Sequence, residues 1–351
     1  MKKLLDRIFI DGLGGMAQGL FATLIIGTII QQIGLFMGGG TGDLIYELGK
    51  IAAGLTGAGI GVGVARKLEA GHLVIVSAAV VGMIGAFAGK ILSGQVLVDG
   101  NLVLAGPGEP LGAFAAAYLA IEIGILISGK TKLDIILTPL VCIGTGSAVG
   151  LFVGPPISEF MLWLGALINW GTEQQPFLMG IVVSVLMGMI LTLPISSAAL
   201  GVILNLSGLA AGAATIGCCC NMIGFAVASW RENKFSGFLA QGIGTSMLQI
   251  PNIVRRPLIW LPVILSSAVL GPIGTMLLHM TNNATGSGMG TAGLVGPLMT
   301  WQVMTQSEAG VIVLGKIILI QFILPAAVTL LISEFMRKKK WIRQGDMKLE
   351  L

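Results

Sequence analysis

Residues 72–93 read HLVIVSAAVVGMIGAFAGKILS, a run in which Lys90 is the only Asp, Glu, Lys or Arg side chain. Crossing the hydrocarbon core of a bilayer takes roughly 20 residues of α-helix, so this run is long enough to cross. Lipid offers no hydrogen bonds to the backbone, and therefore only helices and closed barrels span it. A barrel strand alternates apolar and polar side chains, whereas this run does not. The sequence therefore predicts a transmembrane helix here.

The whole chain has the composition of a membrane protein rather than of a soluble domain. Of its 351 residues, 55% are hydrophobic and only 10% are charged, and the mean hydropathy is +0.94. In a soluble domain about a quarter of the residues are charged. The 53 glycines would weaken helices in water, but in membranes small residues let helices pack closely. We therefore expect an all-α polytopic membrane protein.

Further apolar runs predict about ten transmembrane helices, with some segments broken or re-entrant. The predicted spans are residues 13–36, 43–65, 72–93, 109–128, 133–154, 177–203, 208–230, 236–254, 258–281 and 310–336. Similar small-residue patterns within residues 139–150 and 262–271 suggest an internal repeat, in which the third to sixth spans recur as the seventh to tenth. Chance similarity between small-residue helices is the alternative. We expect residues 1–351 to form a single membrane-embedded domain.

The basic residues give the predicted orientation of the chain. Loops rich in Lys and Arg lie in the cytoplasm by the positive-inside rule. With ten spans, one face collects Lys2, Lys3, Arg7, Arg66, Lys67, Lys130, Lys132, Arg255, Arg256, Arg337, Lys338, Lys339, Lys340, Arg343 and Lys348. Arg231 and Lys234 are the exception, because ten spans place them on the other face. We therefore expect a multi-pass protein of the bacterial cytoplasmic membrane with both termini in the cytoplasm.

The two ends of the chain carry separate predictions. Residues 1–11 predict a short interfacial helix with an apolar side toward lipid. The apolar run that follows, residues 14–37, is too long for the core of a signal peptide, so we expect this end to be retained. Residues 337–351 predict a basic cytoplasmic tail that binds anionic membrane lipid. Binding of a cytoplasmic partner protein is the alternative.

The most unusual segment reads TNNATGSGMGTAG at residues 281–293. Its glycines disfavour a stable helix, yet it has none of the charge of a typical solvated loop. Such backbone at membrane depth persists only where it is buried in protein or lines a water-filled cavity. Its amides and hydroxyls can bind a neutral polyhydroxy solute. The predicted solute-binding residues are Asn282, Asn283, Thr285, Ser287 and Thr291. A packed outer turn without a ligand is the alternative.

A second interruption of the apolar pattern is the sequence LPISS at residues 193–197, which Asn205 follows. Pro194 lacks a backbone N–H and kinks a helix. Broken helices often border transport sites, so Ser196, Ser197 and Asn205 are predicted to bind the solute. An ordinary kink, satisfied by the two serines, is the alternative.

Two ionisable residues are further candidates for solute binding. Glu122 lies within the fourth predicted span with no charged neighbour in sequence, and ionisable residues inside spans are often functional. It could accept hydrogen bonds from a hydroxyl of the solute or carry a proton, or else pair with a helix such as the one carrying Lys316. His279 adjoins the glycine-rich segment and can titrate near neutral pH. A structural role for this histidine is the alternative.

The remaining motifs favour packing over chemistry. Residues 57–63 read GAGIGVG, but they lie within a span and lack the strand that a dinucleotide-binding fold needs, so we predict a helix-packing face. The amides of Asn221, Gln241, Gln249 and Asn252 are predicted to join helices. The cysteines at 218–220 show no disulfide or metal spacing. We expect no cofactor, no metal, no catalytic residue and no nucleic-acid partner.

Three stretches resemble enzyme IIC-like membrane proteins, a family classed with the phosphotransferase-system sugar permeases that includes the perfringolysin regulator-like proteins. The stretches are residues 1–34, residues 106–114 (GPGEPLGAF) and residues 282–296 (NNATGSGMGTAGLVG). The resemblance implies a permease domain, a homodimer and a solute site near mid-membrane. In true sugar systems a separate or fused IIB protein passes phosphate to the sugar. We expect no fused IIB domain here, since the chain ends shortly after the last predicted span.

Two functions follow as hypotheses. The first is an enzyme IIC-like permease for a sugar or another small polar solute, which works with a separate IIB protein if phosphate is transferred. The second is a membrane sensor or regulator that keeps a permease scaffold without transport and engages a cytoplasmic regulator. A membrane-embedded enzyme is disfavoured because no pairing of a nucleophile with a base is evident.

Overall fold

The computed structural model describes residues 7–98, 100–172 and 174–349. The chain forms two compact units, Met1–Met161 (unit 1) and Leu162–Leu351 (unit 2). The predicted single domain, residues 1–351, stays a prediction. Each unit is built from apolar helices, as the composition indicates.

Unit 1 consists of helices and one small hairpin. Its elements are η1 (Arg7–Gly12), α2 (Leu13–Leu20), η2 (Phe21–Ile25), α3 (Ile26–Met37), α4 (Gly39–Gly54), α5 (Thr56–Lys67), α6 (His72–Leu92), β1 (Leu97–Val98), β2 (Asn101–Leu102), α7 (Pro110–Ile127) and α8 (Asp134–Thr172), which continues into unit 2. The first four form one continuous stretch of 31 residues. Residues 7–11 of the predicted interfacial helix begin this stretch, and residues 1–6 lie outside the described residues.

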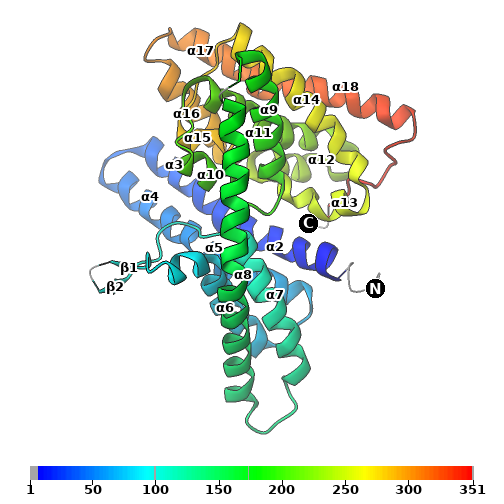
Figure 1. Cartoon of the computed structure of the whole chain (residues 1–351). Coiled ribbons are helices and arrows are strands. Elements are labelled where there is room, and N and C mark those ends of the chain that lie inside the picture. The colour runs from blue at the N-terminus through cyan, green and yellow to red at the C-terminus, as the bar shows by residue number, and fades with distance from the viewer. Residues whose placement is uncertain (1–6, 99, 173, 350–351) are drawn as a thin grey trace. The chain divides into compact units, whose positions relative to one another are not determined.

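Glycine contacts hold the helices of unit 1 close together. A Cβ atom at Gly15 would lie 2.5 Å from the carbonyl oxygen of Gly63, and one at Gly57 would lie 2.6 Å from that of Gly82. Only glycine permits such close approach of two backbones. The predicted packing face at residues 57–63 is thereby confirmed. In Figure 1, α3 and α4 lie side by side as a hairpin of helices, and here too glycines face the partner helix.

Unit 2 contains more interruptions than unit 1. After α8 come α9 (Pro176–Thr192), α10 (Ser197–Ile203), α11 (Gly208–Ala228), α12 (Trp230–Leu239), η3 (Ala240–Gly244), η4 (Ser246–Gln249), α13 (Ile250–Arg255), η5 (Pro257–Trp260), α14 (Leu261–Pro272), η6 (Ile273–Leu277), α15 (Ala284–Ser287), η7 (Ala292–Leu294), α16 (Val295–Met304), α17 (Gly310–Ile317), η8 (Ile318–Ile323) and α18 (Leu324–Lys338). Helix α11 is the core of the unit, since 89% of its most apolar window is buried.

The end of the chain folds back onto unit 2. After α18, residues 339–349 turn toward α12 and α13 (Figure 1). Asn233 donates a hydrogen bond from Nδ2 to the carbonyl of Met347 at 2.8 Å, and the amide of Leu349 donates to its Oδ1 at 2.8 Å. Asn252 donates to the carbonyl of Lys348 at 2.9 Å. Side chains near both ends of the segment 230–256 therefore contact the same tail.

These contacts overturn the predicted span at 236–254. A segment that starts and ends beside the same tail enters unit 2 from one end and returns to that end, so it is re-entrant. Arg231 and Lys234 follow α11 at this tail end of unit 2, and Arg231 pairs with Glu334 of α18 at 2.9 Å. Arg231 and Lys234 are therefore no longer an exception among the basic residues of unit 2. They were placed on the other face only because residues 236–254 were counted as a span.

The described residues include seven helices long and apolar enough to cross a membrane, or eight if the bent pair α4–α5 counts as one span. The all-α polytopic membrane fold with broken segments is confirmed, and these seven or eight helices compare with the approximate count of ten that the sequence predicted. Two predicted spans that the repeat requires, 177–203 and 236–254, are not among these helices, and the first is represented by the shorter apolar helix α9 (Pro176–Thr192). The internal repeat stays a prediction.

Candidate functional site

The polar interruptions of unit 2 converge on α11 from opposite ends. The bridge between Gly208 and Asn282 lies at the start of α11, and the carbonyl of Ala228, at its end, accepts a hydrogen bond from Arg337 at 3.0 Å. A helix of this length extends roughly 30 Å. The glycine-rich segment therefore enters from the end opposite the tail, whereas residues 230–256 enter from the tail end.

Asn282 organises the glycine-rich segment. Its Nδ2 donates to Thr215 of α11 at 2.7 Å and lies 3.1 Å from the hydroxyl oxygen of Thr300. Its Oδ1 accepts from the amide of Asn283 at 2.8 Å. The residue is 1% exposed, so its amide is committed to partners within the protein. This residue holds the segment against the core.

The turn that follows is fixed by further local bonds. Asn283 accepts from the amide of Gly286 at 2.9 Å and so caps the short helix α15. Ser287 donates to the carbonyl of Ala284 at 2.8 Å, and Ser197, from the break after α9, donates to that of Gly288 at 2.6 Å. The two predicted interruptions of unit 2 are therefore in direct contact.

Thr291 joins the two re-entrant segments. Its hydroxyl donates to the carbonyl of Gly242 in η3 at 2.5 Å, and it is fully buried. It also lies 3.5 Å from the sulfur of Met222, in the second half of α11. The tip of the glycine-rich segment thus reaches deep into unit 2 and meets the tip of the segment from the tail end.

Four of the predicted site residues of unit 2 are accessible instead of buried. Asn205, His279 and Thr285 are exposed and Asn283 is half-buried. They lie on the two segments that the bridge between Gly208 and Asn282 joins, at the end of unit 2 opposite the tail. We call these four residues the polar mouth. Both Asn205 and His279 have a φ of +48°, a left-handed conformation rare for residues other than glycine.

A buried network of hydroxyls and amides lies further inside. Asn221 of α11 accepts hydrogen bonds at Oδ1 from Thr192 at 3.1 Å and from Trp260 at 3.2 Å. Thr192, at the end of α9, also lies 2.8 Å from the hydroxyl of Ser246. The prediction that Asn221 joins helices is confirmed. Ser196, next to this break, is buried and has an interaction of its own.

A row of amides links this interior to the tail. Gln249 donates to Gln241 at 2.8 Å and to the carbonyl of Met347 at 3.0 Å. Asn252 in turn donates to Gln249 at 2.8 Å, and Gln241 to Ser229 at 2.9 Å. These three amides bond η3, η4 and α13 to one another and to the tail, so the prediction that they join helices is confirmed.

Glu122 lies in unit 1, whereas the other nine predicted site residues lie in unit 2. Its carboxylate pairs with Arg7 at 2.5 Å, and the two side chains are 31% and 38% exposed. The suggested alternative partner, Lys316, pairs with Glu308 at 2.7 Å instead. Sequence separation hid the pair with Arg7, because the two residues lie 115 positions apart and on different helices.

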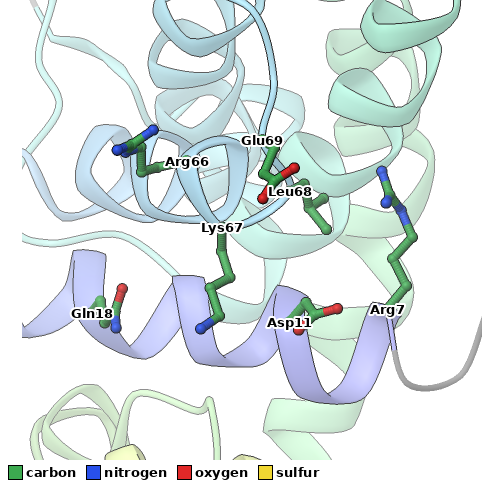
Figure 2. Close-up of a pocket in the computed structure, with 7 residues that line it drawn as sticks. All are labelled: Arg7, Asp11, Gln18, Arg66, Lys67, Leu68 and Glu69. Atoms are coloured by element: carbon green, nitrogen blue, oxygen red, sulfur yellow. The ribbon is translucent and has the colours of Figure 1, made fainter. Parts of the chain in front are cut away.

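A charged cavity of about 580 Å³ lies beside Arg7 in unit 1. It is lined by Arg7, Asp11, Gln18, Arg66, Lys67, Leu68 and Glu69. In Figure 2, Lys67 reaches from the end of α5 toward the helix that carries Asp11 and Gln18, while Arg66 points away from that helix. Both carboxylates lie among the basic side chains, so the cavity carries mixed charge.

The four cysteines lie inside the protein. Cys142 and Cys218–Cys220 are all free and buried. Within residues 7–98, 100–172 and 174–349, no group of three or more His, Cys, Asp or Glu residues is arranged to hold a metal ion.

Comparison with known families assigns the chain. The family model described as "Phosphotransferase system, EIIC" matches residues 10–349. The chain belongs to the EIIC family. This EIIC protein is a multi-pass membrane protein and a permease component of sugar transport, so the resemblance in the sequence is confirmed. No curated protein matches the EIIC chain.

Sequence reasoning missed several residues of this EIIC protein that hold its polar segments. Thr192, Thr215 and Ser246 are single hydroxyls within apolar stretches, and such residues commonly bond only to their own helix. Their long-range partners depend on how the segments fold back. The proline at 194 was the one local signal of the break that brings Thr192 to Ser246.

Proposed function

We propose that this EIIC protein binds a sugar, or a closely related small polar solute, and moves it across the bacterial cytoplasmic membrane. The chain carries no phosphotransfer chemistry of its own in this proposal. A separate IIB protein supplies the phosphate where the solute is phosphorylated. The observation that carries the proposal is the family match over residues 10–349, joined with two polar segments that meet inside unit 2.

The polar residues of unit 2 divide into two roles. Those in the polar mouth are accessible, and Asn205, Asn283 and Thr285 can donate to and accept from sugar hydroxyls. Those that are buried already have partners, so Ser197, Asn282, Ser287 and Thr291 act by holding the segments in position. A buried polar group left without its partner costs free energy, which gives the segments a defined geometry.

Glu122 has a separate proposed role. About a third of its side chain is exposed, so a solute hydroxyl can reach the carboxylate beside Arg7. Glu122→Gln removes the carboxylate that would contact the solute, whereas Arg7→Gln keeps this carboxylate and removes its ion-pair partner. A solute contact predicts that Glu122→Gln lowers uptake more than Arg7→Gln. Equal losses in both variants would assign the pair to structure.

We further propose a homodimer with membrane lipid around it and both termini in the cytoplasm. The dimer is supported by the family resemblance alone. The orientation is supported by the tail-end position of Arg231 and Lys234, which brings the basic residues of unit 2 closer to the positive-inside rule.

Solute counterflow into proteoliposomes tests the proposed function. Proteoliposomes that contain the purified chain are loaded with one unlabelled hexose, pentose or polyol at a time. Uptake of the same compound in labelled form is then followed. We expect at least one sugar to be exchanged, and exchange to fall at least tenfold in a combined Asn283→Ala and Thr285→Ala variant. Absence of binding and exchange for every compound, with normally folded protein, would refute a permease and favour the sensor hypothesis.

A further inference from the structure

A second cavity, of about 370 Å³, lies where α18 ends and the tail turns back onto unit 2. It is lined by Arg231, Arg337, Lys340, Ile342, Arg343 and Gln344, four of which are cations and none of which is acidic. We call it the tail groove. Its composition differs from the mixed charge of the cavity in unit 1.

Two of the four cations of the tail groove form ion pairs with carboxylates of unit 2. Arg337 pairs with Glu232 at 2.9 Å, and Arg231 pairs with Glu334 at 2.9 Å. Lys340 and Arg343 are exposed, and among the described residues neither side chain forms an ion pair. The Nε of Arg337 is buried and lacks a hydrogen-bond partner within the same residues. The groove therefore has positive charge to offer to an anion.

The tail holds these cations in fixed positions. Ile342 is 2% exposed and Met347 is fully buried, so both anchor the tail on unit 2. The amide of Arg343 donates to Asp346 at 2.8 Å, and that of Lys340 closes the end of α18 by donating to Arg337 at 2.9 Å. A site whose backbone is fixed loses less conformational entropy when it binds a ligand.

Exposed apolar and aromatic side chains lie next to the tail groove. Trp341 and Phe335 are 53% and 54% exposed, and their rings are in edge contact with centroids 6.4 Å apart. One turn earlier on α18, Leu331 is 72% exposed. Tryptophan and basic side chains favour the level of the lipid headgroups, and exposed leucine favours the acyl chains. The groove thus lies beside a surface suited to lipid.

We propose that the tail groove binds the headgroup phosphate of an anionic phospholipid. Lys340 and Arg343 contact the phosphate, and the exposed side chains of Leu331 and Phe335 contact the acyl chains. Free phosphate shares the charge of the headgroup but gains nothing from the apolar surface. Binding at a specific site in the groove depends on which cations are removed. General attraction of a basic tail to the membrane depends on how many are removed.

Titration of the purified full chain in detergent with phosphatidylglycerol or phosphatidylcholine, followed by native mass spectrometry, tests the proposal. A Lys or Arg near an anionic surface contributes about fivefold to affinity. We therefore expect Lys340→Gln with Arg343→Gln to weaken phosphatidylglycerol binding roughly 25-fold and to leave phosphatidylcholine unchanged. The charge-keeping pair, Lys340→Arg with Arg343→Lys, should restore binding.

The matched control is Lys130→Gln with Lys132→Gln, which removes the same charge from an exposed loop of unit 1. This control should bind phosphatidylglycerol like the wild type. An equal loss in the control and the groove variant would overturn the proposal in favour of net charge. Inorganic phosphate that displaces the lipid at the same concentration would also overturn it, since the site would then hold a free anion.

Discussion

The ion pair between Glu232 and Arg337 allows the folded tail to be tested quantitatively. The side chains are 3% and 9% exposed, so solvent screens their attraction little. Glu232→Gln leaves the guanidinium buried without its counter-charge, and breaking a buried pair in this way costs roughly 3–5 kcal/mol. Because Arg337 keeps its bond to the carbonyl of Ala228, we expect the lower end, about 3 kcal/mol.

The neighbouring pair between Arg231 and Glu334 provides a matched control. It has the same 2.9 Å separation, but its side chains are 61% and 32% exposed. Exposed pairs contribute about 0.2–1 kcal/mol, so Arg231→Gln should lower stability by no more than that. Replacing both members of the buried pair, in Glu232→Leu with Arg337→Met, should recover most of the loss.

Equilibrium unfolding of the purified chain in detergent, followed by circular dichroism, measures these differences. The expected order of the free energy of unfolding is wild type, then Arg231→Gln, with Glu232→Gln well below both. If Glu232→Gln and Arg231→Gln lay within about 0.5 kcal/mol of each other, the buried tail contact would be refuted.

Three further predictions address packing, the meeting of the re-entrant segments and sidedness. Gly57→Ala should destabilise the protein by about 1–3 kcal/mol in a melting assay, because its Cβ would meet a backbone oxygen 2.6 Å away, whereas Gly54→Ala has open space and should be neutral. Thr291→Val should cost about 1–3 kcal/mol and reduce uptake, because it leaves a buried carbonyl without a donor, and Thr291→Ser should restore both. In right-side-out vesicles, Lys234→Cys should react with an impermeant maleimide from the same side as Lys340→Cys. Labelling of these two positions from opposite sides would support the predicted span at 236–254.

The sequence predicted the continuous helices of unit 1 well. The spans at 72–93 and 109–128 correspond to α6 (His72–Leu92) and α7 (Pro110–Ile127). Here a long apolar run has one plausible structure, since lipid requires that the backbone bond to itself. The glycine face at 57–63 was also predictable, because small residues at regular spacing have little other use in a membrane helix.

The error at 236–254 has a physical cause. A re-entrant segment is shielded by protein and a spanning helix by lipid, so both need apolar side chains and hydropathy does not separate them. The distinguishing signal was the set of amides at Gln241, Gln249 and Asn252, which bond to the tail and to one another. Their long-range partners were not visible in the local sequence.

The candidate site could be predicted only as a region. Residues 286–293 of the glycine-rich segment are buried in protein, one of the two conditions under which such backbone persists at membrane depth. Which of its polar groups remain available depends on bonds to α11 and η3. Asn282 and Thr291 looked equivalent to Asn283 and Thr285 in sequence, yet the first two are fully buried with partners.

Protection of the polar mouth by its solute tests the central claim most directly. A single cysteine is introduced as Thr285→Cys, and its reaction with a water-soluble maleimide is timed with and without the sugar that the protein exchanges. We predict that saturating sugar slows labelling of this position several-fold and leaves labelling of Gly40→Cys, in unit 1, unchanged. Equal labelling rates at Thr285→Cys with and without a sugar that is exchanged would contradict binding at this site.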